Sequence, residues 1–422
     1  MVYRIKIKSP FVVAVSLLLV TVILSIIITG NNGQQKKALD ANQASISTEL
    51  TQFQPVNGEY KKHSGDMQAV WVSYLSLSLK DDFSEQAFKE NFDNIIKTAK
   101  EHKINTLIVH VRPFGDALYP SKYYPWSHIL TGTQGNDPGY DPLKYMIEAT
   151  HNAGLEFQAW INPLRIKSKD IPKTLCDSSL FNKWNKEDKT KDYVLSYEDG
   201  YYLNPAIDEV RETIINGVQE IVENYAVDGI HFDDYFYPTE DSSFDKTSYK
   251  AYLDSLDDEC VPLTLNDWRC ANINKLIAGV YGKIHSITNN VEFGISPQCN
   301  INNDINMGAD VYSWCSTYGY IDYVCPQLYV NFDHALLPFN TTADKWKKLI
   351  TNDKIKFYIG LAVYKAGSDV DDGTWEKSND ILKQEIEYGK EIGVDGFMLY
   401  DIEYLVKEQT QKEVENVMSV LN

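Results

Sequence analysis

The sequence predicts an α/β protein whose main domain, residues 67–422, is a (β/α)8 TIM barrel preceded by a single N-terminal transmembrane helix and a flexible linker. Two observations predict the barrel. From residue 67 onwards, eight short apolar runs rich in Val, Ile, Phe and Tyr alternate with helical patterns. Polar residues recur at one end of nearly every run, where a barrel carries its binding residues. A doubly wound open sheet is the competing layout, but it predicts a Gly-rich loop after the first strand, and residues 71–79 contain no Gly.

The first 66 residues divide into three parts. Residues 1–9 carry three basic side chains, residues 10–29 carry no charge, and residues 30–66 are rich in Asn, Gln, Ser, Lys and Gly. A helix of about 20 residues spans about 30 Å, the thickness of the hydrocarbon layer. We therefore expect a cytoplasmic N-terminus, a signal anchor over residues 10–29 and a flexible linker over residues 30–66, with the barrel outside the cell. Cleavage of the anchor, which would release a secreted protein, is the alternative.

The eight strands and their helices are expected at regular intervals. The strands are expected at residues 68–74, 106–111, 156–161, 229–232, 292–296, 323–328, 356–363 and 396–400. Several helical patterns begin at a capping residue, such as Ser84 or Asp141, or end before a glycine. The helices are expected at residues 84–102, 142–153, 205–224, 268–288, 343–350, 379–392 and 410–421.

Composition limits the partners. The chain has 40 basic and 59 acidic side chains and a net charge of -19, with no basic run beyond the N-terminus, which argues against nucleic acid. The 28 Tyr, 16 Phe and 8 Trp suit a groove for an uncharged polymer such as a glycan, although an ordinary large core accounts for them equally well. The expected contact with the membrane is the N-terminal helix, and the oligomeric state stays open.

Alternation along the strands predicts which side chains face the barrel interior. Because Ile230 and Phe232 make an apolar outer face, His231 and Asp233 share the inner one. For the last run, which leads to Asp401 and Glu403, the alternation does not decide which side chains face the interior. The same reasoning places these residues on the inner side of their strands or just beyond them: Trp71, His110, Arg112, Trp160, Asn162, Gln327, Tyr329 and Tyr364. A purely structural barrel has no reason to collect so many polar groups, because burying them unpaired is costly.

Eight segments, in chain order, carry a resemblance to a known family. They are residues 65–74, VHVRPF (109–114), AWINPL (159–164), YLNP (202–205), DGIHFDDYFYP (228–238), GISP (294–297), DYVCPQLY (322–329) and GVDGFMLYD (393–401). Together they resemble the glycosyl hydrolase-like family 10 group of bacterial envelope proteins, from about residue 67 to the end. The resemblance implies a TIM-barrel glycoside hydrolase that acts on the glycan strands of peptidoglycan.

The candidate catalytic residues are Asp233, Asp234, Asp401 and Glu403. Glycoside hydrolysis needs an acid that protonates the leaving oxygen and a group that supplies or positions a nucleophile. The hypothesis we favour is substrate assistance, in which Asp234 is the acid and Asp233 orients the 2-acetamido group of the sugar. A second hypothesis makes Asp233 or Asp234 the nucleophile and Asp401 or Glu403 the acid. In a third, the two consecutive acids only cap a loop and bind Arg112.

Further residues are candidates for binding the saccharide. Aromatic side chains would stack on sugar faces, amides would bind hydroxyl and N-acetyl groups, and His110 or Arg112 would bind hydroxyls or a lactyl carboxylate. The set is Trp71, His110, Arg112, Trp160, Asn162, His231, Tyr235, Gln327, Tyr329 and Tyr364. The eight histidines form no close cluster in the sequence, so we predict no metal and no cofactor. A metal-dependent polysaccharide deacetylase and a non-catalytic barrel that binds wall glycan are the alternative functions.

Overall fold

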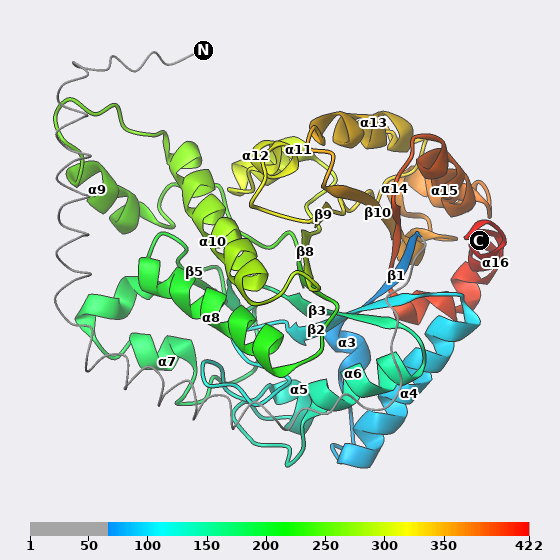
Figure 1. Ribbon diagram of the computed structural model, residues 1–422, viewed down its shortest axis with the longest axis horizontal. Coiled ribbons are helices and arrows are strands. Elements are labelled where there is room, and N and C mark those ends of the chain that lie inside the picture. The colour runs from blue at the N-terminus through cyan, green and yellow to red at the C-terminus, as the bar shows by residue number, and fades with distance from the viewer. Residues whose placement is uncertain (1–65, 422) are drawn as a thin grey trace, which may run out of the picture. The chain divides into compact units, whose positions relative to one another are not determined.

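Eight parallel strands close into a barrel in the computed structural model, which describes residues 66–421 (Figure 1). They are β1 Met67–Val72, β2 Thr106–Arg112, β3 Glu156–Ile161, β7 Gly229–Phe232, β8 Glu292–Ile295, β9 Tyr323–Val324, β10 Lys356–Ala362 and β11 Gly396–Tyr400. β1 pairs in parallel with both β2 and β11, and this pairing closes the ring. The predicted TIM barrel is confirmed.

The predicted N-terminal parts are not described by the structure. Residues 1–9, the anchor at residues 10–29 and the linker at residues 30–66, apart from Asp66, lie outside the described range. Within residues 66–421, no helix combines the length and apolar character needed to cross a bilayer. The anchor and the linker therefore stay predictions.

Helices form a layer around the barrel (Figure 1). The longer ones are α4 Glu85–Glu101, α6 Pro142–Asn152, α8 Asp208–Asn224, α10 Leu265–Ile287, α13 Phe339–Leu349, α15 Ile381–Glu391 and α16 Gln411–Val420. The shorter ones are α3 Tyr74–Leu77, α5 His128–Thr131, α7 Leu180–Trp184, α9 Lys246–Asp254, α11 Ile301–Asn306, α12 Val311–Ser316 and α14 Val370–Gly373. Short 3-10 helices are η1 Asp188–Tyr193, η2 Val363–Lys365, η3 Thr374–Glu376, η4 Ile402–Leu405 and η5 Glu408–Thr410.

Capping side chains set where the first helices begin. Ser84 Oγ accepts the backbone N–H of Ala87 at 3.2 Å, and Asp141 Oδ1 accepts that of Lys144 at 3.0 Å, so both predicted caps are confirmed. α10 begins earlier than predicted because Thr264, whose Oγ accepts a backbone N–H of the first turn, is its cap.

Strand alternation separates two cores. Outward side chains such as Val70, Leu107 and Ile230 pack under the helices. The inward side chains form a second cluster inside the barrel, and Tyr400 packs at its edge. Met398 and Tyr400 are therefore the inward residues of β11, whose orientation the sequence left open. The inward cluster is Met67, Ala69, Trp71, Ile108, Trp160, Tyr323, Cys325, Tyr358 and Met398.

β9 is shorter than the strand expected at residues 323–328. β9 ends at Val324 because Pro326 has no N–H to give to a strand ladder. The chain nevertheless continues along the barrel, since the Gln327 N–H donates to the Pro297 carbonyl at 2.9 Å and Gln327 bridges to Gly360. This path brings Gln327 to the carboxyl end of the ring.

A small antiparallel sheet, not predicted from the sequence, lies between β3 and α8. It consists of β4 Arg165–Lys167, β6 Gly200–Leu203 and β5 Val194–Tyr197, in that order. Because β4 begins four residues after β3 ends, the sheet starts beside the carboxyl ends of the barrel strands.

Candidate active site

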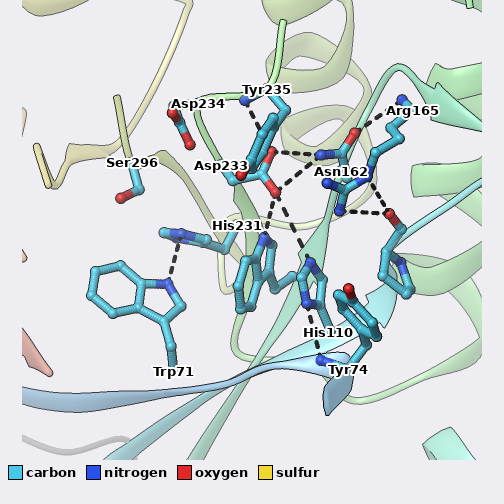
Figure 2. Close-up of polar contacts among 12 residues, drawn as sticks. Trp71, Tyr74, His110, Asn162, Arg165, His231, Asp233, Asp234, Tyr235 and Ser296 are labelled. Atoms are coloured by element: carbon cyan, nitrogen blue, oxygen red, sulfur yellow. Dashed lines mark hydrogen bonds and ion pairs between the residues drawn. The ribbon is translucent and has the colours of Figure 1, made fainter. Parts of the chain in front are cut away.

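Several of the predicted residues meet at the carboxyl end of the barrel (Figure 2). Asn162 follows β3, Asp233 and Asp234 follow β7, and Gln327 follows the short β9. Hydrogen bonds join Asn162 to Asp233 and Gln327 to Asp234. The carboxyl ends of parallel barrel strands all face one rim, which is why residues far apart in the chain come together here.

Asp233 is a buried acceptor held on both oxygens. Its side chain is 3% exposed. Trp160 Nε1 donates to Oδ2 at 3.0 Å, Asn162 Nδ2 lies 3.2 Å from each oxygen, and the backbone N–H of Tyr235 donates to Oδ1 at 3.3 Å. Every one of these partners donates, so they stabilise the ionised carboxylate.

Burial opposes that ionisation. It raises the pKa of Asp233 from 3.8 to about 7, while the positive charge of Arg165 lowers it and the neighbouring Asp234 raises it further. A carboxyl group with a pKa near neutral, in a polar cluster at a barrel rim, is typical of catalytic sites.

Asp234 points away from Asp233 (Figure 2). Its Oδ1 accepts Gln327 Nε2 at 2.9 Å, and the same amide nitrogen donates to the Ser296 carbonyl at 3.0 Å. No hydrogen bond to Oδ2 joins it to another residue of the described chain. Asp234 is half-buried, and burial raises its pKa from the usual value of 3.8. Burial thus makes Asp234 a weaker acid than a free aspartate, and one of its oxygens makes no hydrogen bond to another residue of the described chain.

His110 is a neutral ring beside the pair. Its Nδ1 accepts the Tyr74 backbone N–H at 3.3 Å, so the ring proton lies on Nε2, which is 4.0 Å from Asp233 Oδ2. Burial lowers the pKa of His110 well below 6.5, helped by the charge of Arg165. The ring stacks on Trp160 with 3.3 Å between centroids, so His110 and Asn162 flank Asp233.

Arg112 does not join this group. A register shift between His110 and Arg112 turns the Arg112 side chain off the inner face, which corrects the alternation argument. Its guanidinium lies 4.4 Å from the ring centroid of Tyr124, against which Gly217 of α8 packs.

Arg165 is the cation near the acids, and the sequence reasoning missed it. It is the first residue of β4 and its backbone N–H donates to Asn162 Oδ1 at 2.9 Å. Its charge lowers the pKa of both aspartates against the effect of burial. The only signal in the sequence was a basic residue just after a strand end, at a point where strand alternation no longer applies.

Three predicted binding residues lie inside the barrel rather than on an open face. Trp71 and His231 are 2% and 0% exposed, and Trp160 is covered on one face by His110. Trp71 Nε1 donates to His231 Nε2 at 3.2 Å, so His231 Nδ1 carries the proton and donates to Tyr323 Oη at 2.7 Å. Burial lowers the pKa of His231 to about 3. Trp71 and His231 are thus held in a closed network and Trp160 donates to Asp233, so contact of these three side chains with the sugar stays a prediction.

The remaining tyrosines are placed at the rim. Tyr235 is 52% exposed, while Tyr329 and Tyr364 are half-buried and pack against each other and against Tyr400. Tyr235 is therefore the aromatic face most open to a ligand.

Asp401 and Glu403 differ in exposure. Asp401 is 5% exposed and its Oδ1 accepts the Glu403 backbone N–H at 3.1 Å, which makes it the cap of η4. Burial, followed by the charge of Glu403, raises the pKa of Asp401 to about 6. Glu403 is half-exposed and lies 3.3 Å from Ser76 Oγ and 3.6 Å from Lys407 Nζ, at the edge next to α3. Within residues 66–421, no three His, Cys, Asp or Glu side chains are grouped as metal ligands would be.

Residues 66–377 match the family described as glycosyl hydrolase-like 10. The glycosyl hydrolase YngK of Bacillus subtilis (strain 168) is 32% identical over 342 residues, which cover 76% of this chain and 64% of that protein. The glycosyl hydrolase DigH of Escherichia coli (strain K12) is 32% identical over 377 residues, which cover 83% of this chain and 84% of that protein. The chain thus spans less than two thirds of the Bacillus relative and most of the Escherichia one.

Two solved structures share the fold. The PgaB (BpsB) glycoside hydrolase domain from Bordetella bronchiseptica has a TM-score of 0.55 and 11% identity, covering 85% of this chain and 99% of that domain. The catalytic domain of β-amylase from Paenibacillus polymyxa has a TM-score of 0.57 and 14% identity, covering 86% of this chain and 100% of that domain. At these identities the likeness shows the barrel fold alone.

Proposed function

The chain belongs to the glycosyl hydrolase-like 10 family, and on that premise we propose that it is an exported glycoside hydrolase. The proposed substrate is an N-acetylated cell-wall polysaccharide, the glycan strands of peptidoglycan. The proposed location is the outer face of the cell membrane, with residues 10–29 as a single-pass anchor and no nucleic acid among the partners. The relatives named glycosyl hydrolases support the reaction class. The apolar N-terminal stretch supports export.

The observation that carries the reaction is the unequal environment of two consecutive carboxyl groups. Asp233 accepts hydrogen bonds on both oxygens, whereas Asp234 accepts one and keeps its other oxygen free. Three hydrogen-bond donors around Asp233 stabilise an anion there, whereas Asp234 has an oxygen that can approach a leaving group, so the two acids can divide the roles of anion and acid. Asp234 is therefore the proposed general acid, and Asp233 the proposed carboxylate.

Substrate assistance uses this division. The acetamido oxygen of the sugar attacks its own anomeric carbon, and the bond to the leaving oxygen breaks as Asp234 gives that oxygen its proton. Asp233 accepts the acetamido N–H and stabilises the positive charge that develops on it. A water then attacks the anomeric carbon of the cyclic intermediate, and Asp234 takes a proton back.

Asp401 supports a second route. Its buried carboxyl, with a pKa of about 6, is the acid of a conventional two-carboxylate mechanism in which Asp233 or Asp234 is the nucleophile. The two routes differ in what an Asp401→Asn variant does. Substrate assistance leaves that variant active, whereas the two-carboxylate route makes it as inactive as Asp234→Asn.

The first experiment follows new reducing ends released from N-acetylated glycan strands, with and without EDTA. We expect EDTA-resistant cleavage that Asp234→Asn lowers by about 10²–10⁴-fold, the usual contribution of a general acid. Release of acetate that EDTA abolishes would indicate a deacetylase instead. Tight binding without either product would indicate a glycan-binding protein that does not turn over.

The leaving group tests the two roles separately. The 4-nitrophenolate of a 4-nitrophenyl N-acetylglucosaminide leaves without being protonated. We therefore expect Asp234→Asn to keep most of its activity on this substrate while losing activity on strands. Asp233→Asn should lose activity on both substrates. Equal losses in both variants on both substrates would contradict the assignment.

A further inference from the structure

Arg165 is held rigidly beside the acids. Its Nε and Nη2 both donate to the Pro113 carbonyl, at 3.1 and 3.0 Å. Its guanidinium lies 4.9 Å from the ring centroid of Phe114 and 4.8 Å from that of Tyr235. Two aromatic rings and a carbonyl thus fix the plane of the guanidinium, and Figure 2 shows Arg165 beside Asn162.

One edge of this guanidinium has no protein partner. The Pro113 carbonyl occupies the edge formed by Nε and Nη2, and Nη1 donates to no residue within 66–421. No carboxylate oxygen of the described chain lies within ion-pair distance of Arg165, although Asp233 and Asp234 are near enough for its charge to act on both. Arg269 differs, because that buried arginine donates to Asp245 from Nε and Nη2 and to backbone carbonyls from Nη1 and Nη2.

We propose that the free edge of Arg165 binds a carboxylate carried by the saccharide, so that the enzyme is specific for an acidic amino sugar next to the cleaved bond. The proposal rests on the proposed function, in which the substrate is a wall glycan and the lactyl group of its muramyl units supplies the carboxylate. It replaces Arg112, which the structure turns away from the site, by Arg165 in that role.

Shape and charge both fit a carboxylate. The two parallel N–H groups at the end of a guanidinium match the two oxygens of a carboxylate, and such pairs are stronger than neutral hydrogen bonds. Tyr235 is half exposed, so a sugar lying on its outer face would bring a substituent to the edge of the guanidinium behind it.

The test compares one polymer with and without its carboxylates. The purified full chain is given glycan strands with free lactyl carboxylates and the same strands converted to methylamides. We expect kcat/KM to be about tenfold higher or more for the free carboxylates, the usual effect of a hydrogen bond to a charged group. Arg165→Gln should remove this preference by lowering kcat/KM more on the free carboxylates than on the methylamides, where only the effect of its charge on the two aspartates is lost. Arg165→Lys should retain part of the preference, because lysine keeps the positive charge but lacks the two parallel N–H groups of the guanidinium.

The control is Lys167→Gln, which makes the same charge change two residues along β4 and should leave the preference intact. If Arg165→Gln lowers kcat/KM equally on both polymers, Arg165 acts only through the aspartates and the proposal is overturned. Binding to Asp234→Asn, measured by calorimetry, separates this failure from failure of the proposed function. Carboxylate-dependent binding to this variant, together with no cleavage by the unaltered enzyme, would keep the site and reject the hydrolase, whereas binding with no preference would reject the site.

Discussion

At Asp233, three donors and the low polarity of the barrel interior act against each other. Trp160, Asn162 and the Tyr235 backbone favour the anion, and burial favours the acid, so the pKa of about 7 is a balance that one side chain can shift. The mechanism requires the anion. Activity should therefore fall below neutral pH as Asp233 gains its proton.

We predict that Asn162→Ala moves the fall in activity on the acidic side of the pH–rate profile, its acidic limb, to higher pH. Removing a donor to the carboxylate raises the pKa of Asp233 by about one unit or more, so kcat/KM should fall about tenfold at pH 6 and recover towards pH 9. A pH–rate profile measures it. The exposed amide Asn303 gives the control, since Asn303→Ala should leave the limb in place. A limb that stays in place in Asn162→Ala would mean that another group controls it.

Sequence reasoning reached most of these residues but not all. Strict alternation put His110, Asp233 and Gln327 on the side where the structure has them. It failed at Arg112, because a register shift inside β2 changes the phase without leaving a mark in the hydrophobic pattern. It had no means of finding Arg165, which lies in a small sheet that has neither helical nor barrel periodicity.

At the scale of strands, glycines make room for the polar network under the acids. A Cβ on Gly294 of β8 would lie 2.1 Å from the ring of Tyr323, and one on Gly229 of β7 would lie 2.8 Å from Gln158. Tyr323 donates to Gln158 at 2.5 Å and accepts from His231. These inward positions of neighbouring strands thus have no side chains of their own because large side chains from other strands fill the space.

We predict that Gly294→Ala destabilises the barrel by about 3 kcal/mol, because the ring of Tyr323 cannot yield inside a packed interior. The shift of the urea unfolding midpoint measures it. The matched control is Gly282→Ala in α10, where a Cβ meets no atom within 4 Å. That change should stabilise the protein by about 0.5–1 kcal/mol, since alanine loses less backbone entropy in a helix. Two variants of equal stability would show that the interior relaxes around the added methyl group.

The order of elements was predictable and their ends were less so. The eight strands and seven long helices follow the apolar periods and the caps at Ser84 and Asp141. β9 is short because Pro326 breaks the ladder, and α10 is longer than predicted because Thr264 caps it upstream. Such ends depend on single hydrogen bonds, which an average over a window of residues does not detect.

Across the whole molecule, burial makes several acids weaker than they are in the unfolded chain. Burial raises the pKa values of Asp233 and Glu413 to about 7 and that of Glu385 well above 4.5. Above the unfolded pKa the unfolded chain releases these protons while the folded chain holds them. Stability is therefore highest at low pH as far as these groups are concerned, and is lost as the pH rises towards the folded pKa values. The buried histidines His110 and His231 have lowered pKa values, so their contribution to stability rises with pH. That contribution opposes the effect of the acids only below about pH 6.5, the pKa of an unfolded histidine.

Glu385 on α15 isolates the effect, because it is 0% exposed and neither of its carboxyl oxygens has a hydrogen-bond partner within residues 66–421. Glu385→Gln keeps the shape and removes the proton exchange, so we predict a Tm raised by several degrees at pH 8 and almost unchanged at pH 5. Thermal unfolding at the two pH values measures the difference. Glu387, which is exposed two residues later on the same helix, supplies the control, and Glu387→Gln should change the Tm equally little at both pH values. If Glu385→Gln behaved like this control, Glu385 would have to be ionised in the folded barrel, and the raised pKa that burial gives it would be wrong.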